Sequence, residues 1–118
     1  QLHRVPQGES IGYSRKTFLM RDSIIGAIPI GYADGLDRRL SNRKGYCLVN
    51  GKRADYVGNI CMDVAMIDVT DIACQEGDRV EVFGDHLPVT ALSDIMGTIP
   101  YEVLTGISNR VKRVYFQD

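Results

Sequence analysis

Short runs of alternating apolar and polar residues recur along this 118-residue chain, and turn-forming residues separate them. Such runs, rich in β-branched and aromatic residues, are typical of strands that are buried on one face. Their spacing predicts a mainly β domain, which we expect to be a Greek-key-like barrel or sandwich with one or two short helices. The predicted strands are Ile11–Phe18, Ile24–Ile30, Tyr46–Val49, Tyr56–Ile60, Ala65–Val69, Arg79–Phe83 and Val111–Phe116.

Turn residues connect these predicted strands. Asn50-Gly51 lies between Tyr46–Val49 and Lys52–Ala54, and both of its residues accept the positive φ of a type I′ hairpin turn. A second turn is predicted at Gln75–Asp78, before an alternating apolar run. The first ten residues are the only stretch that we interpret as a linker.

Helical patterning is confined to the region that follows Thr90, whose side chain can cap a helix N-terminus. Gly97 then provides a C-terminal stop, and Pro100 can occupy the first turn of a second short helix. Glu102 would lie near the positive end of that helix dipole. The apolar face of the first helix is predicted to comprise Ala91, Leu92, Ile95 and Met96.

The composition is that of one ordinary globular domain, with 44% hydrophobic residues, 25% charged residues and a net charge of -1. These values argue against disorder and against a nucleic-acid-binding surface. No apolar run approaches the roughly 20 residues of a membrane helix, and the N-terminus has no signal-peptide core. We therefore expect a cytoplasmic domain without membrane contact, belonging to a longer chain because it does not begin with methionine.

Cysteine and histidine are too few and too widely spaced for a disulfide framework or a metal site. The three cysteines, Cys47, Cys61 and Cys74, are an odd number without a C-x-x-C spacing, and neither His3 nor His86 stands at metal-ligand spacing from any of them. We therefore expect reduced thiols and no bound metal.

A tyrosine stands in the glycine-bounded turn Gly-Tyr-Ala-Asp-Gly that follows the run Ile24–Ile30. Turns use Gly, Asn or Asp for reasons of backbone geometry, but they do not require a phenol. Tyr32 is therefore either a packing residue or a reagent, and Asp34 is either a turn former or a functional carboxylate. The residue types alone favour the structural alternatives.

Two other segments have the same mixed character, Gly58–Asp63 and Gly97–Val103. Met62 is expected to fill the core and Cys61 to act as a small buried hydrophobe, unless they belong to a site. Tyr101 is expected at an amphipathic surface edge, but at a helix start its hydroxyl could also donate to a phosphate.

Five separated segments, taken in order, resemble the C-terminal domain of alanine racemase, a pyridoxal-phosphate enzyme: GESIGYSRKT, IPIGYADG, VNGKRADYVGNICMD, GTIPYEVLTGIS and NRVKRVYF. The resemblance extends from about Gly8 to Phe116. It implies a mainly β domain that completes the active site of the partner subunit in a head-to-tail homodimer. It also implies an N-terminal (β/α)8 barrel domain that carries the cofactor lysine.

The cofactor lysine is expected outside this chain, because none of its lysines stands in a segment like the family's cofactor-lysine motif: Lys16, Lys44, Lys52 and Lys112. The resemblance therefore implies that pyridoxal 5'-phosphate is bound covalently by the missing barrel domain. We expect the isolated chain to be inactive. The complete enzyme would interconvert L-alanine and D-alanine for peptidoglycan synthesis.

The resemblance also implies roles for individual residues. Racemisation is simplest with two bases on opposite faces of the substrate, and Tyr32 would be the base for L-alanine while the barrel lysine serves D-alanine. A phenol base at neutral pH needs nearby positive charge or hydrogen-bond donors. Met62 would offer its backbone N–H to the substrate carboxylate, and Tyr101 its hydroxyl to the cofactor phosphate. Asp63 and Asp34 would lie around these residues or at the substrate entrance.

The chain departs from the family at Asn59, where an arginine is common before I-C-M-D, so the charge that supports Tyr32 is missing or comes from elsewhere. Arg38 and Arg39 either line the substrate entrance or form a solvated face. Two other functions remain open at this point. One is a racemase for serine or other amino acids, or a decarboxylase, although G-Y-A-D-G and C-M-D favour racemisation. The other is a non-catalytic β module for dimerisation or binding.

Overall fold

The computed structural model describes residues 1–8, 10–11, 17–18 and 21–113. The predicted runs Ile11–Phe18 and Val111–Phe116 therefore lie partly outside the described residues, as do the first and last of the resembling segments. At the ends of the first run, β2 (Ser10–Ile11) and β3 (Thr17–Phe18) pair with each other as a small antiparallel ladder.

The main element is a six-stranded antiparallel sheet with the strand order β1-β4-β7-β6-β5-β8. Three strands in succession, β5 to β7, are neighbours, and β8 returns to pair with β5, which is the Greek-key arrangement. The strands are β1 (Leu2–Val5), β4 (Ser23–Ile28), β5 (Tyr46–Val49), β6 (Lys52–Val57), β7 (Ala65–Asp68) and β8 (Val80–Glu81).

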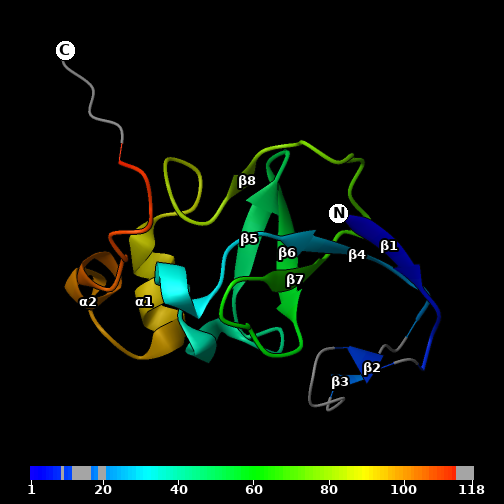
Figure 1. Ribbon diagram of the computed structural model, residues 1–118, viewed down its shortest axis with the longest axis horizontal. Coiled ribbons are helices and arrows are strands. Elements are labelled where there is room, and N and C mark those ends of the chain that lie inside the picture. The colour runs from blue at the N-terminus through cyan, green and yellow to red at the C-terminus, as the bar shows by residue number, and fades with distance from the viewer. Residues whose placement is uncertain (9, 12–16, 19–20, 114–118) are drawn as a thin grey trace.

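All the helical elements gather at one end of the molecule, away from β1 and the β2–β3 pair (Figure 1). They are the 3₁₀ helices η1 (Tyr32–Asp34) and η2 (Arg38–Leu40) and the α-helices α1 (Val89–Met96) and α2 (Pro100–Thr105). The prediction of a mainly β domain with two short helices is confirmed.

The interpretation of the first ten residues as a linker is wrong. Leu2–Val5 forms the edge strand β1, which pairs with β4 through Leu2 opposite Gly26 and Val5 opposite Ser23. Its two end residues are half-buried and its middle residues are exposed. A pattern this short becomes a strand because β4 offers it backbone partners, which the local sequence does not reveal.

The hairpin at Asn50-Gly51 is confirmed, since both residues have positive φ, 51° and 77°. The strand that follows it differs from the prediction Tyr56–Ile60. It starts directly after the turn and ends at Val57, because Gly58 adopts a left-handed φ of 69° that an extended ladder does not accept. Three other predicted strands end early, at Ile28 before Pro29, at Asp68 and, for the run Arg79–Phe83, at Glu81.

The first helix begins one residue before Thr90, because Pro88 takes the extended N-cap conformation. The prediction that Thr90 caps the helix is therefore wrong. Gly97 ends the helix as predicted, with a left-handed φ of 74° and its N–H donating to the Asp94 carbonyl. Pro100 occupies the first turn of α2, also as predicted.

The core lies between the sheet and the helical end, and it includes residues that flank or end the 3₁₀ helices η1 and η2. Leu36 and Leu40, which flank or end these 3₁₀ helices, belong to the same buried cluster as residues of both α-helices. The remaining members include Ile28, Cys47, Val49, Ala54, Tyr56, Ile60, Ile67, Leu92, Met96 and Val103. The core thus fixes the backbone on which Tyr32 stands.

Tyr56 buries its hydroxyl in this core beside the Cys47 thiol and without a hydrogen bond of normal geometry among the described residues, and the whole side chain is only 1% exposed. Burial raises the pKa of Tyr56 and of the neighbouring Cys47 thiol, the latter to about 12. Both groups therefore stay protonated at neutral pH, and neither provides a nucleophile.

Replacing Tyr56 by Phe is expected to leave the free energy of unfolding unchanged or to raise it by up to about 1 kcal/mol, because an unpaired buried hydroxyl opposes folding. Urea unfolding of the chain measures this change. Tyr46→Phe in the adjacent strand is the control, since its ring lies 4.0 Å from the Arg53 guanidinium and keeps that contact. A clear loss of stability in Tyr56→Phe alone would show that the hydroxyl is bonded.

Candidate active-site half

The turn at η1 lies directly against the loop that follows β6. Tyr32 N donates to the Cys61 carbonyl at 2.9 Å, and Ala33 N donates to the Met62 carbonyl at 3.0 Å. A Cβ on Gly31 would lie 2.2 Å from the Cys61 oxygen and 2.4 Å from the Met62 oxygen. Only glycine permits this approach. Two of the segments that the sequence singled out are thus joined main chain to main chain.

Asp34 closes the same turn and attaches it to a third segment. Its Oδ2 accepts a hydrogen bond from Gly31 N at 3.0 Å, and its carbonyl accepts one from Ser108 N at 3.1 Å. Gly35 follows with a φ of 111°, and a Cβ there would lie 2.6 Å from the Gly106 oxygen. Asp34 is therefore a turn former, and the turn rests on the chain that follows α2.

The candidate residues that are not turn formers point outward. Tyr32 is 43% exposed, Met62 52% and Tyr101 72%. The alternatives in which Tyr32 and Met62 pack in the core are wrong, whereas Cys61 is half-buried. Tyr101 stands in the first turn of α2, as the sequence predicted. Large exposed hydrophobic groups of this kind are typical of a surface that another domain or protein covers.

The adjacent arginines Arg38 and Arg39 have different partners. The Arg38 guanidinium carbon lies 5.8 Å from the centre of the Tyr32 ring, a cation–π distance. Arg39 forms ion pairs with Asp37 at 2.9 Å and with Glu102 at 2.8 Å. The interpretation of the pair as a solvated face is therefore incomplete, because Arg39 ties η2 to α2 and Arg38 brings positive charge to Tyr32.

A cleft of about 420 Å³ lies between this arginine pair and α2. The hydrogen bonds from Arg39 lower the pKa of Asp37, and those from Thr98 and Arg39 lower the pKa of Glu102, so both carboxylates are ionised at neutral pH. The cleft is lined by Tyr32, Gly35, Asp37, Arg38, Met96, Glu102, Val103, Thr105 and Gly106.

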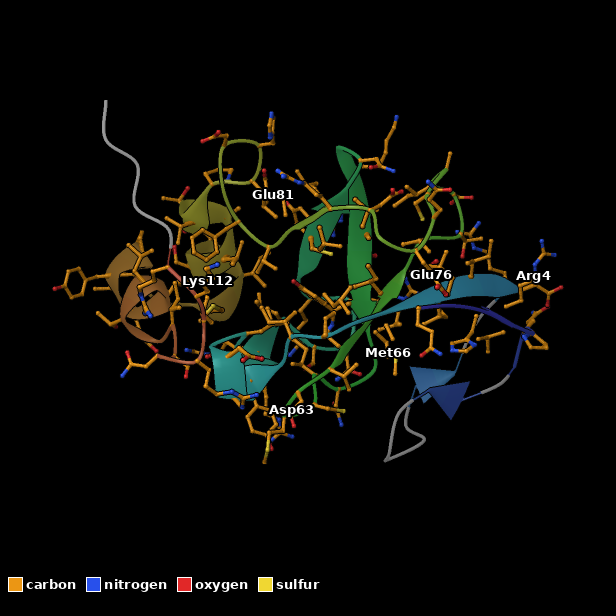
Figure 2. All side chains as sticks on the ribbon, turned by 45° about the horizontal axis from the view of Figure 1, so that its top comes forward. Arg4, Asp63, Met66, Glu76, Glu81 and Lys112 are labelled. Carbon is orange, nitrogen blue, oxygen red and sulfur yellow. The ribbon has the colours of Figure 1, made fainter. Side chains whose placement is uncertain are left out.

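Sequence reasoning missed Arg110, which contacts both acidic candidates. Its Nη2 lies 2.9 Å from Asp63 Oδ1 and its Nε lies 3.6 Å from Asp34 Oδ1. Figure 2 shows Asp63 on the outer side of its loop, below η1 and η2 and away from the sheet. The only available signal was the position of Arg110 in the last resembling segment, N-R-V-K-R-V-Y-F.

Asn59 occupies the position where the resemblance leads one to expect arginine. It accepts a hydrogen bond from Asn42 Nδ2 at 2.9 Å, and Asn42 stands in a left-handed turn with a φ of 58°. The amide thus joins two loops at the same end of the sheet. A cation does lie over the Tyr32 ring, but it comes from Arg38.

The described lysines, Lys44, Lys52 and Lys112, are all exposed. Among the described residues, no three His, Cys, Asp or Glu side chains are placed to hold a metal ion. Neither of the two described α-helices has the length and apolar character needed to cross a membrane.

Comparison with known proteins identifies the family. The family model described as "Alanine racemase, C-terminal domain" matches residues 1–115. The chain belongs to this family. Its membership confirms the resemblance stated above, and the joined turn and loop belong to this domain.

Curated relatives cover almost the whole chain. Alanine racemase 1 of Caldanaerobacter subterraneus subsp. tengcongensis is 48% identical over 99% of this chain and 31% of its own length. Alanine racemase 1 of Clostridium acetobutylicum is 44% identical over the same shares. The chain thus spans about a third of the curated alanine racemases that it matches.

Solved structures agree in fold. Alanine racemase from Bartonella henselae with covalently bound pyridoxal phosphate superposes with a TM-score of 0.93 at 40% identity, over 98% of this chain and 33% of that one. Alanine racemase from Bacillus anthracis with bound L-Ala-P gives a TM-score of 0.92 at 34% identity, over 100% and 31%. The architecture described here is that of the alanine racemase C-terminal domain.

Gly31→Ala is expected to reduce the free energy of unfolding by about 3 kcal/mol or more, because the methyl group would displace two carbonyls and break the hydrogen bonds beside them. Gly51→Ala is the control. It is strained by its left-handed φ alone, with no atom within 4 Å of the new methyl, and should cost about 1 kcal/mol. Equal losses in urea unfolding would contradict the close approach at Gly31.

The Asp37 carboxylate is expected to stabilise the fold fully above pH 3.8 and progressively less as the pH falls below that value. Its pKa is lowered from 3.8 in the folded chain by Arg39, so its contribution is complete above 3.8 and disappears as pH falls through the lowered value. Asp37→Asn should therefore be less stable than wild type at pH 6, and the difference should shrink toward pH 2. Urea unfolding across this range measures it, and a difference independent of pH would contradict the ion pair.

Proposed function

We propose that this chain is the C-terminal domain of a pyridoxal-phosphate-dependent alanine racemase that interconverts L-alanine and D-alanine for peptidoglycan synthesis in the cytoplasm. The family match over residues 1–115 carries this proposal. The relatives compared above are named alanine racemases, which favours alanine over serine as the substrate. The bound L-Ala-P of the Bacillus anthracis protein also fits an alanine-sized substrate.

The remaining two thirds of the protein are proposed to form an N-terminal (β/α)8 barrel domain, and the complete chain a head-to-tail homodimer. Exposed hydrophobic residues support this arrangement. Tyr32 and Met62 stand outward on the turn and loop, and Ile99, Tyr101 and Leu104 stand outward on or beside α2. Such groups need a covering surface. The set on the turn and loop suits one active site of the proposed dimer, and the set on α2 suits the other.

Met62 is proposed to present its backbone to the substrate carboxylate. Its N–H belongs to the Cys61–Met62 peptide, whose carbonyl accepts a hydrogen bond from Tyr32 N, so this peptide keeps one orientation relative to Tyr32. Small errors in the position of a substrate group cost reaction rate. The rigid union at Gly31 would keep the tyrosine and the carboxylate-binding peptide at a constant separation. Asp34 and Asp63 would belong to the surroundings of these residues at the substrate entrance.

Pyridoxal phosphate, when bound, takes up the electron pair that remains at Cα after the proton has left. The covalent attachment is assigned to the barrel domain, because no lysine of this chain stands in a segment like the family's cofactor-lysine motif. Tyr101 is proposed to donate its hydroxyl to the cofactor phosphate. Glu102 beside it is held by Arg39, which fixes the first turn of α2.

Tyr32 is proposed as the base that removes the Cα proton of L-alanine. Its position next to Met62 and the positive charge of Arg38 over its ring support this role. The same tripeptide, Ile-Gly-Tyr, also occurs at Ile11–Tyr13 in the first resembling segment. Tyr13 lies outside the described residues and is the competing candidate that an experiment has to separate from Tyr32.

The test is α-proton exchange of L-alanine and D-alanine in heavy water, measured separately with the full-length protein. Tyr32→Phe is expected to slow exchange from L-alanine by about a hundredfold or more, and exchange from D-alanine much less. Tyr13→Phe is the matched variant. If it shows the L-specific loss and Tyr32→Phe does not, the base is Tyr13. A wild-type protein that racemises no alanine would contradict the proposed function.

A further inference from the structure

Arg110 places one guanidinium between the carboxylates of Asp34 and Asp63. The contact to Asp63 is a hydrogen-bonded ion pair of 2.9 Å, and the contact to Asp34 is an ion pair of 3.6 Å. The two carboxylates come from different loops, far apart in the sequence. Asp34 is mostly buried and Asp63 is largely exposed, with side-chain exposures of 14% and 62%.

These carboxylates stand immediately beyond the last backbone hydrogen bond between the turn and the loop. That bond joins Ala33 N to the Met62 carbonyl, so Asp34 and Asp63 are the next residue on each side. Two carboxylates that face one cation would repel each other without it. The backbone contact at Gly31 is therefore followed by two like charges. Among the described residues, Arg110 is the cation that pairs with both of them.

We propose that Arg110 is a positioning residue, which keeps the Tyr32 turn and the Met62 loop together by neutralising Asp34 and Asp63. Its effect on catalysis rests on the function proposed above, whereas its effect on the structure does not.

The two acids differ in their other contacts, and this difference predicts which segment moves when Arg110 is replaced. Asp34 is also held by Gly31 N through its Oδ2 and by Ser108 N through its carbonyl. Asp63 is exposed, and Arg110 is its recorded side-chain partner. Loss of the cation should therefore release the Met62 loop, while the turn stays seated. The hydrogen bond to Asp63 and the charge of Asp34 raise the pKa of Arg110, so it remains charged throughout the usual pH range.

Amide hydrogen exchange of Tyr32 and Ala33 in the full-length protein tests the structural part. Arg110→Met should accelerate exchange at these two amides severalfold, because their acceptors lie on the released loop. Arg21→Met is the matched control: Arg21 forms a 2.7 Å ion pair with Asp71 and is equally exposed, at 56%. Unchanged exchange in Arg110→Met, or equal acceleration in both variants, would overturn the proposal.

A second substitution separates charge from packing. Adding Asp63→Asn to Arg110→Met removes the repulsion while keeping the side-chain shape, so it should restore most of the exchange protection. Molar salt should do the same for Arg110→Met by screening. If neither restores protection, Arg110 acts through its contacts alone and the proposed neutralisation is wrong.

Kinetics of the full-length enzyme test the link to the reaction. Arg110→Met should raise the KM for alanine severalfold with a smaller change in kcat, since the loop carries the peptide proposed to bind the substrate carboxylate. Asp63→Asn in the same chain should reverse the increase. A KM unaffected by Arg110→Met would overturn the catalytic part. A wild type inactive on alanine would contradict the proposed function and leave the exchange result as evidence on its own.

Discussion

The organisation of this domain depends on one steric condition, the approach of the Gly31 backbone to the carbonyls of Cys61 and Met62. No Cβ fits between them, so the turn at η1 and the loop after β6 meet main chain to main chain. This contact is the joint of the domain. The side chains on either side of the contact, Tyr32 and Met62, then have to leave it toward solvent. The same condition that makes the joint rigid also exposes the groups that a partner can use.

Arginine side chains connect the chain segments around this joint. Arg39 connects the start of η2 to the first turn of α2, and Arg110 connects the turn at η1 to the loop after β6. Each guanidinium takes two carboxylates from separate segments. A planar group with several fixed donors suits such bridging better than an ammonium would. Partly solvated ion pairs hold segments in place more than they stabilise the whole fold.

The sequence predicted local backbone features where the residue type leaves little choice. The hairpin at Asn50-Gly51 and the helix end at Gly97 were found because these residues accept positive φ, whereas the role of Met62 comes from the resemblance and stays a proposal. The strand Leu2–Val5 was missed because its stability comes from pairing with β4. Arg110 was missed for a related reason: the partners of a long charged side chain depend on which loops the fold brings together.

The contacts of this domain differ greatly in the length of chain that they enclose. The β5–β6 hairpin closes over a turn of two residues, whereas Arg110 and Asp63 are 47 residues apart. The entropic cost of closing a loop rises with its length, and long-range contacts are made slowly during folding. The β5–β6 hairpin can therefore form before the contact between Arg110 and Asp63. A partly folded chain would retain the hairpin and lack that contact, so correct secondary structure alone would be no sign of a competent site.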